Sequence, residues 1–341
     1  MERKSEIYLR RKKLFRGARF SSAIMYNGDP VKGIDTSFAY FSGCGVDGSY
    51  LILTKNRGTL FTHEMNLRAA KKVSKYPVEL LGKEAAKQLK KACGRGKTAF
   101  SGTDVSTARY FALKKKAKLK LTDASEKMQQ VRGEKSQSEI KALHESAVIA
   151  RKILEKLDPW KYRTENELAQ ALKIIALKAG AEISFEPIVA TGKNSALPHH
   201  QATQKKLEDF VLVDFGVKHD GYCSDFTRCY FRRKNMKEKI AYDKCAAIFE
   251  EIAKKLPECK AGKDIAKLSD ELMKKYQMPK MIHAIGHGIG MDVHEYPHLN
   301  GKSKDSLKNV VIAIEPAAYF QKFGVRFEEM MANTRNGWKK A

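Results

Sequence analysis

The sequence lacks long apolar runs and closely spaced cysteines. No stretch approaches the roughly 18–20 apolar residues of a membrane-spanning helix, so a membrane protein is not expected. Residues 1–19 contain eight Lys or Arg and no apolar segment of the kind that directs secretion. The six cysteines form no CxxC pair, which favours free thiols in a reducing, cytoplasmic location.

Acidic residues are also few for the number of basic ones. The formal net charge is +26, from 65 Lys and Arg against 39 Asp and Glu. Such an excess is compatible with an acidic partner, such as nucleic acid or an anionic membrane. The basic residues are nevertheless spread along the chain, and runs such as Lys114–Lys116 are typical of a solvated face. We therefore expect neither a nucleic acid nor a membrane as partner.

A length of 341 residues is compatible with two domains. Residues 1–125 alternate short β-rich segments with helical ones, which predicts a small α/β domain. Within it, Ala39–Phe41 is one of the expected strands. Ser136 and Glu139 then form a capping box that predicts the start of a long helix. We therefore expect a second domain over residues 126–341.

The second domain shows one arrangement twice, two helices followed by antiparallel strands. The first helices are predicted from Ser136 to Asp158 and from Thr164 to Gly180, and the second pair lies around residues 237–256 and 262–276. The repetition predicts an internal pseudo-two-fold. The expected fold class is α+β, with a curved antiparallel sheet backed by helices.

Residues 210–231 are predicted to form a β-hairpin around the polar turn at residues 218–221. Centring the hairpin on this turn places Asp214 opposite Asp225. Directly opposed side chains lie roughly 4.5–5.5 Å apart, so two bare carboxylates there would repel each other. A pair of divalent cations removes this cost. The alternative is a solvated acidic pair on an edge strand.

A second hairpin is predicted on either side of Gln321-Lys322, and it places Glu315 opposite Glu328. A slip of one residue would send these carboxylates to opposite faces. Glu315 follows the apolar run Val-Val-Ile-Ala-Ile, where an isolated carboxylate is costly; a salt bridge to Arg326 or Lys322 is the alternative. Two hairpins that each present a carboxylate pair indicate one metal site.

Four of the nine histidines lie within residues 282–298. His287 stands between glycines, which permit a close backbone approach, and it is the candidate nitrogen ligand. The other histidines of this segment are candidates for contacts around the metal or to substrate: His283, His294 and His298. His199 lies in another polar segment before the first hairpin. Oxygen ligands with one imidazole suit Mn, Co or Fe, with Zn as a further option.

These motifs resemble those of the pita-bread metallopeptidases, which include methionine aminopeptidase, aminopeptidase P and the Xaa-Pro dipeptidases (prolidases). The five matching positions, in chain order, are Asp214, Asp225, His287, Glu315 and Glu328. The resemblance covers roughly residues 130–335. A separate N-terminal domain is similar to the creatinase/prolidase type, which favours the Xaa-Pro peptidases over methionine aminopeptidase.

The resemblance implies a site with two divalent metal ions (Mn, Co, Fe or Zn) held by these five residues. Asp225 and Glu328 would bridge the two metals. A hydroxide between the metals would attack the scissile carbonyl, with Glu315 as the proton shuttle.

It also implies roles for residues that contact the peptide. His199 and His294 would stabilise the tetrahedral intermediate and the leaving imino nitrogen, and His283 would help to shape the proline pocket. Arg326 would orient Glu328 or receive a carboxylate. Many prolidases carry Arg where this chain has His298, a weaker and pH-dependent cation, which leaves strict dipeptide specificity open.

We therefore expect a cytoplasmic, homodimeric metallo-exopeptidase that cleaves short proline-containing peptides as an Xaa-Pro dipeptidase. The alternatives are an aminopeptidase P acting on longer peptides and a methionine aminopeptidase. A non-catalytic family member that binds nucleic acid or protein is a further alternative, from a different functional class.

Overall fold

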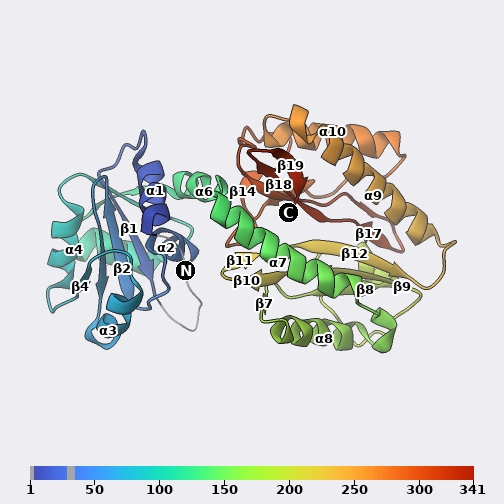
Figure 1. Cartoon of the computed structure of the whole chain (residues 1–341), viewed down its shortest axis with the longest axis horizontal. Helices are drawn as coiled ribbons and strands as arrows, with labels where there is room; N and C mark the ends of the chain where they lie inside the picture. Colours follow the sequence, from blue (N-terminus) through green and yellow to red (C-terminus); the bar gives the residue numbers. More distant parts are fainter. Residues whose placement is uncertain (1–3, 29–34) are drawn as a thin grey trace. The chain divides into compact units, whose positions relative to one another are not determined.

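A computed structural model describes residues 4–28 and 35–341. The chain divides into two compact units, residues 1–132 and 133–341 (Figure 1). The boundary expected at residue 125 falls at the first residue of helix α6 (Ser125–Gly133). All six cysteines are free, as predicted. No helix in the described ranges is long and apolar enough to cross a membrane.

The first unit contains a six-stranded mixed sheet with the order β4-β3-β2-β1-β5-β6. Its strands are β1 (Ser22–Asn27), β2 (Ser49–Thr54), β3 (Gly58–Thr62), β4 (Val78–Leu80), β5 (Lys97–Phe100) and β6 (Lys120–Asp123). Its helices are α1 (Lys4–Phe15), α2 (Thr36–Ser42), α3 (Glu64–Val73), α4 (Ala85–Cys93) and α5 (Thr107–Phe111), which continues as the π-helix η2 (Ala112–Lys116). Strand β1 pairs antiparallel with β2 and parallel with β5.

The strand expected at Ala39–Phe41 is wrong, because these residues lie in helix α2. Asp35 caps the helix by accepting a hydrogen bond from the backbone N–H of Phe38 at 2.5 Å. Gly43 ends the helix with a φ of 69°. A short aromatic run does not distinguish strand from helix by periodicity, and here the caps on both sides decide the structure.

The second unit confirms the predicted repetition. Helices α7 (Gln137–Glu155) and α8 (Glu165–Lys178) precede one set of strands, and α9 (Lys237–Lys255) and α10 (Gly262–Lys275) precede the other. The first set is β7 (Glu182–Ile183), β8 (Ile188–Thr191), β9 (Phe210–Phe215), β10 (Val217–His219), β11 (Tyr222–Cys223) and β12 (Phe226–Phe231). The second set is β13 (Gly286–Gly288), β14 (Glu295–His298), β15 (Val311–Ile314), β16 (Ala317–Tyr319), β17 (Gly324–Arg326), β18 (Glu329–Thr334) and β19 (Gly337–Lys340).

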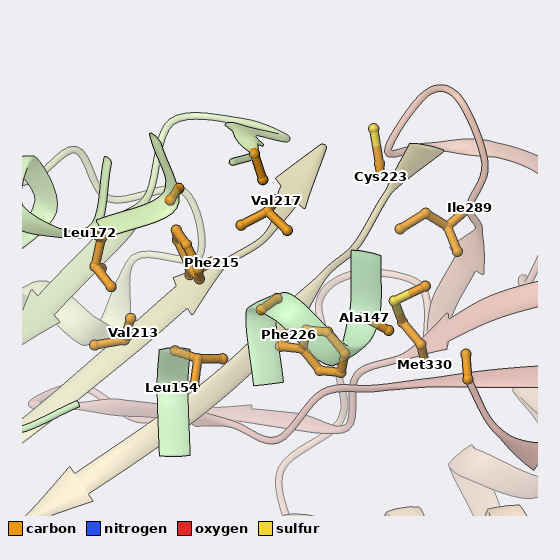
Figure 2. Close-up of a cluster of buried hydrophobic side chains, with 14 of the residues drawn as sticks. Ala147, Leu154, Leu172, Val213, Phe215, Val217, Cys223, Phe226, Ile289 and Met330 are labelled. Carbon is orange, nitrogen blue, oxygen red and sulfur yellow. The ribbon is translucent and has the colours of Figure 1, made fainter. Parts of the chain in front are cut away.

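Alternate residues of the fully buried strand β9 enter two different cores. Val213 and Phe215 pack with residues of α7 and α8, as Figure 2 shows. Phe210 and Leu212 pack with residues of α9 and α10. Because side chains alternate along a strand, Asp214 belongs to the same series as Leu212, inside the unit. This burial on both faces holds the strand that carries Asp214 rigidly.

The first hairpin has a tighter turn than the sequence suggested. Asp220 and Gly221 both have positive φ values, 48° and 83°, as in a type I′ turn. His219 and Tyr222 pair directly on either side of this two-residue turn. The centre of the hairpin is therefore one residue further along the chain than predicted.

This shift changes the partner of the first carboxylate. Asp214 lies opposite Thr227, so the predicted pairing of Asp214 with Asp225 is wrong. Moving a hairpin centre by one residue moves each partner by two, and residues two apart on a strand face the same side. The two carboxylates therefore remain neighbours, on a diagonal instead of directly opposite.

The register of the second hairpin is confirmed. The hairpin consists of two strand pairs, β15 with β18 and β16 with β17, separated by a short break. Both pairs have the same register, since Ile314 pairs with Glu329 and Ala317 pairs with Arg326. This register sets Glu315 opposite Glu328. The backbone N–H of Phe320 donates to the carbonyl of Phe323 at 2.7 Å, which closes the turn at Gln321-Lys322.

Candidate metal centre

Three buried carboxylates meet in the second unit. Asp214 lies in β9, Asp225 precedes β12, and Glu328 precedes β18. One oxygen from each lies within 4.8 Å of the others. The two sets of strands join at this point, where the backbone N–H of Glu328 donates to the carbonyl of Thr227 at 3.2 Å. The cluster is thus assembled by contacts between the two halves of the repeat.

An imidazole and a fourth carboxylate complete the cluster. The Nε2 atom of His287, in β13, lies 3.5 Å from Asp225 and 3.9 Å from Glu328. Glu315 forms a second group with His287 and Glu328, again with ligand atoms within 4.8 Å. A Cβ at Gly288 would lie 2.3 Å from the carbonyl of Tyr296, so this glycine allows β14 to approach the strand that carries His287. The structure brings all five predicted ligands together.

Electrostatics of the cluster fit a metal ion. Burial raises the pKa of Asp225 and Glu328, and the charges of neighbouring carboxylates raise it further. The Oδ1 atoms of Asp214 and Asp225 are buried and have no hydrogen-bond partner in the described part of the chain. A divalent cation would supply both the missing partner and the missing positive charge. These oxygens with one imidazole match the ligand preferences of Mn, Co, Fe or Zn.

Arg326 connects the carboxylates. Its Nη2 donates to Asp214 at 2.5 Å, its Nε to Thr227 at 2.8 Å and its Nη1 to Tyr319 at 2.9 Å. The hydroxyl of Thr227 in turn donates to Glu328 at 2.8 Å. Arg326 therefore orients Asp214 directly and Glu328 through Thr227.

The sequence reasoning missed Thr227 and Tyr319. Thr227 carried a usable signal, because it lies two residues after Asp225 and side chains two apart on a strand share a face. A hydroxyl beside a carboxylate is a common partner in metal sites.

A cavity of about 880 Å³ opens over the cluster. Three of the predicted histidines line it: His199, His283 and His294. Its apolar wall includes Phe185, Pro187, Ile188 and Val293. The Nε2 atom of His283 lies 3.0 Å from the hydroxyl of Tyr319, so His283 is held by the same network as Arg326. A cavity of this size suits a short peptide.

His294 packs against the candidate ligand His287. Their ring centroids lie 4.2 Å apart, with one ring edge directed at the other. Burial, followed by the nearby His287, lowers the pKa of His294 to about 4. His294 is therefore a neutral imidazole near pH 7, which can donate a hydrogen bond without carrying a charge.

The structure does not bring His298 to the cavity. His298 lies outside the lining residues, and its exposed ring pairs with Asp305 at 2.9 Å. Arg326 does line the cavity, but each of its nitrogens already donates a hydrogen bond within the protein, so its contact with a substrate carboxylate stays a prediction. Sequence position alone could not reveal these competing partners.

Glu165, at the start of α8, holds the segment that carries His199. It is fully buried. Its carboxylate accepts from the backbone of Thr191 and from the side chain of Asn194, and it pairs with His200 at 2.9 Å. Thr203 adds two further bonds. These contacts lie on both sides of His199, which fixes its place in the cavity wall.

A peptide-sized cavity over a buried cluster of carboxylates and imidazole defines a metal-dependent hydrolase. Residues 140–335 match metallopeptidase family M24, and residues 12–133 match the creatinase/prolidase N-terminal domain. The chain belongs to family M24 and is a peptidase, with a creatinase-like N-terminal domain and a pita-bread domain. Membership of this family implies divalent metal ions as cofactors.

Individual relatives agree with this assignment. The chain is 31% identical over 317 residues to an Xaa-Pro dipeptidase of Pyrococcus horikoshii, which covers 88% of each protein. It is 34% identical over 227 residues to an uncharacterized peptidase of Methanocaldococcus jannaschii, covering 63% of this chain and 65% of that one. The solved X-Pro aminopeptidase of Thermotoga maritima superposes with a TM-score of 0.82 at 25% identity, over 96% and 97% of the two chains.

Proposed function

We propose that the protein hydrolyses Xaa-Pro peptide bonds with two divalent metal ions. The residues that would hold them are Asp214, Asp225, His287, Glu315 and Glu328. The supporting observation is the pair of buried carboxylate oxygens, in Asp214 and Asp225, that lack a partner in the described chain. When bound, the metals would lower the pKa of a water molecule towards neutrality and polarise the scissile carbonyl.

The chain's own side chains would position the peptide and move protons. Glu315 lies 3.8 Å from His283 and 4.0 Å from Arg326, at the edge of the cavity, and would carry the proton from water to the leaving nitrogen. His199 and His294 would donate hydrogen bonds to the oxygen that becomes negative in the transition state.

The apolar wall of the cavity supports a proline-containing substrate. Phe185, Pro187, Ile188 and Val293 would bury the pyrrolidine ring, and the lack of an N–H on proline leaves no donor unpaired there. The names of the relatives, an Xaa-Pro dipeptidase and an X-Pro aminopeptidase, point to the same bond.

The two candidate activities, Xaa-Pro dipeptidase and Xaa-Pro aminopeptidase, differ in the length of the peptide that they cleave. The Xaa-Pro dipeptidase remains the first candidate, because two relatives that match 88% of the chain carry this name, whereas a third with the same match is named a putative Xaa-Pro aminopeptidase. One observation favours an aminopeptidase acting on longer peptides. Among the described residues that line the cavity, Arg326 is the one Arg or Lys, and its nitrogens are already bonded. A dipeptide's terminal carboxylate would therefore have to share the one guanidinium of the cavity wall with these partners.

A substrate panel on metal-reconstituted protein separates these candidates. We expect cleavage of an Xaa-Pro dipeptide and an Xaa-Pro tripeptide, with loss of activity after chelation and recovery with Mn, Co, Fe or Zn. The ratio of the two rates decides between dipeptidase and aminopeptidase. Preferred cleavage of a Met-Ala peptide would instead assign a methionine aminopeptidase. Full metal loading without hydrolysis of any of the three peptides would contradict the proposal.

Substitution of Glu315 tests the proton shuttle. Glu315→Ala should abolish hydrolysis while the fold survives, as circular dichroism would show; undiminished turnover would remove the assigned role.

The homodimer and the cytoplasmic location stay predictions. Light scattering checks the first, since a monomer would contradict it.

A further inference from the structure

The N-terminal unit carries most of the excess positive charge. Residues 1–132 contain 29 Lys and Arg against 11 Asp and Glu, whereas residues 133–341 contain 36 against 28. The smaller unit therefore holds a net charge of +18 and the larger one +8. The basic residues occur in both units, but the excess over acidic residues is concentrated in the N-terminal one.

One face of this unit is covered by α4 and by the continuous helix α5–η2. Leu89 of α4 and Leu113 of η2 are buried in a single cluster with Ile52 of the central sheet. Lys90 also donates from its Nζ to the carbonyl of Lys118 at 2.9 Å, so α4 lies beside the segment that follows η2. The outward sides of these elements form one surface.

We call this surface the α4–η2 face and define it by residues 83–97 and 106–120. It contains twelve Lys and Arg and a single acid, Glu84, which pairs with Lys87. Arg109 is occupied, since it lies over the ring of Tyr26 at 3.8 Å. The exposed basic side chains include Lys91, Lys114, Lys115, Lys116, Lys118 and Lys120. The two segments of this face therefore carry almost no counter-charge of their own.

An exposed aromatic ring stands in the middle of these lysines. Phe111 is 46% exposed, and the Nζ of Lys115 lies 5.4 Å from its ring centroid. Lys114 lies 5.5 Å from the ring of the neighbouring Tyr110. The lysines follow on a π-helical turn, an irregularity that is frequent at functional sites. Lysines beside an exposed aromatic ring are the combination that binds phosphates and stacks on bases.

We propose that the α4–η2 face binds single-stranded nucleic acid, with its lysines on the phosphates and Phe111 stacked on a base. An anionic membrane fits less well, because insertion needs several exposed apolar residues on one side of a helix. Phe111 is the one exposed large hydrophobic residue in the two segments that define the face. The proposal is independent of the peptidase site.

The test uses the full-length protein and a fluorescein-labelled single-stranded RNA of mixed sequence. Fluorescence anisotropy is measured between about 50 and 200 mM salt. We expect the affinity to fall steeply with salt, and the triple variant Lys114→Glu/Lys115→Glu/Lys116→Glu to bind about tenfold or more weakly. Phe111→Ala should weaken binding about fivefold with an unchanged salt slope, because stacking releases no counterions.

A matched control separates this face from general charge. Lys254, Lys255 and Lys274 are exposed on α9 and α10, and their reversal to Glu changes the net charge equally; we expect less than about a twofold effect. A second disruption, Lys91→Glu with Lys118→Glu, should also weaken binding if α4 belongs to the surface.

Three results would overturn the proposal. One is equal weakening by the two triple variants, and another is an unchanged affinity of Phe111→Ala. The third is tighter binding to phosphatidylserine vesicles than to RNA through the same lysines. Thermal unfolding of each variant verifies that its fold is intact.

Discussion

Arg326 and Asp214 form a buried ion pair, with the guanidinium Nη2 2.5 Å from the carboxylate Oδ2. Asp214 thus has a cation without any metal, whereas burial and neighbouring charges raise the pKa of Asp225 and Glu328. The candidate metal centre is therefore asymmetric. Asp214 has its counter-charge within the protein, whereas Asp225 and Glu328 depend on a metal ion for their charge balance.

Arg326→Lys should weaken metal binding. Lysine keeps the charge but cannot reach Asp214, Thr227 and Tyr319 with one planar fork. Loss of such a supporting contact typically costs about 10–100-fold in metal affinity or activity. Calorimetric titration with Mn²⁺ measures this loss. Arg233→Lys, on an exposed side chain paired with Asp209, is the control, and equal affinities for both variants would refute the supporting role.

Asp225→Asn should stabilise the metal-free protein and abolish its response to metal. The raised pKa means that the folded state holds protons which the unfolded state releases, so metal-free wild type loses stability as the pH rises above about 4. The variant lacks this charge and should unfold at a higher temperature in chelator.

Added Mn²⁺ should then stabilise wild type and leave Asp225→Asn almost unchanged. Thermal unfolding with chelator and with Mn²⁺ measures both effects. Asp243→Asn changes the same charge on the surface of α9, where Asp243 pairs with Lys239, and should behave as wild type. A full metal response in Asp225→Asn would remove this residue from the ligand set.

Tyr319→Phe should reduce hydrolysis more than metal binding. The hydroxyl of Tyr319 contacts both Arg326 and His283, and its removal leaves each of them one hydrogen bond short. We expect kcat/KM on an Xaa-Pro substrate to fall about tenfold, which corresponds to about 1.4 kcal/mol. If Tyr319→Phe lowered the metal affinity as much as Arg326→Lys does, the loss of activity would be explained by metal binding alone, and the contact of Tyr319 with His283 would have no effect of its own on hydrolysis.

Glu165→Gln should destabilise the fold in a pH-dependent way. Burial tends to raise the pKa of Glu165, but hydrogen bonds from His200 and Thr203 outweigh it and lower the pKa below the ordinary value. The carboxylate therefore contributes stability above the unfolded pKa, and this contribution is lost as the pH falls through the folded pKa.

Urea unfolding should show a loss of about 2–3 kcal/mol in Glu165→Gln at pH 7, with a smaller difference below about pH 4. Because the segment around His199 loses its anchor, kcat should also fall. Glu167→Gln, on the exposed side of the same helix turn, is the control. A destabilisation that is the same at all pH values would show that the charge of Glu165 is not responsible.

The sequence by itself determined the elements with strong local signals. The capping box of Ser136 and Glu139 forms as predicted, because both partners lie within one helical turn. The second hairpin keeps its predicted register, since its turn and its apolar strands agree. The five candidate ligands were recognisable because each stands in a distinctive local motif.

Only the tertiary structure decided which side chains meet. The first hairpin has a two-residue turn instead of the predicted four-residue turn, and Asp214 therefore pairs with Thr227. This turn depends on the backbone conformation of Asp220. His298 pairs with Asp305, which no local motif announces.

The grouping of positive charge on one surface was also decided by the tertiary structure. A sequence lists lysines in order, whereas packing of α4 and η2 on one sheet face collects them into a surface. Contacts between residues far apart in the chain depend on the path of the whole backbone, and local periodicity contains no information about that path.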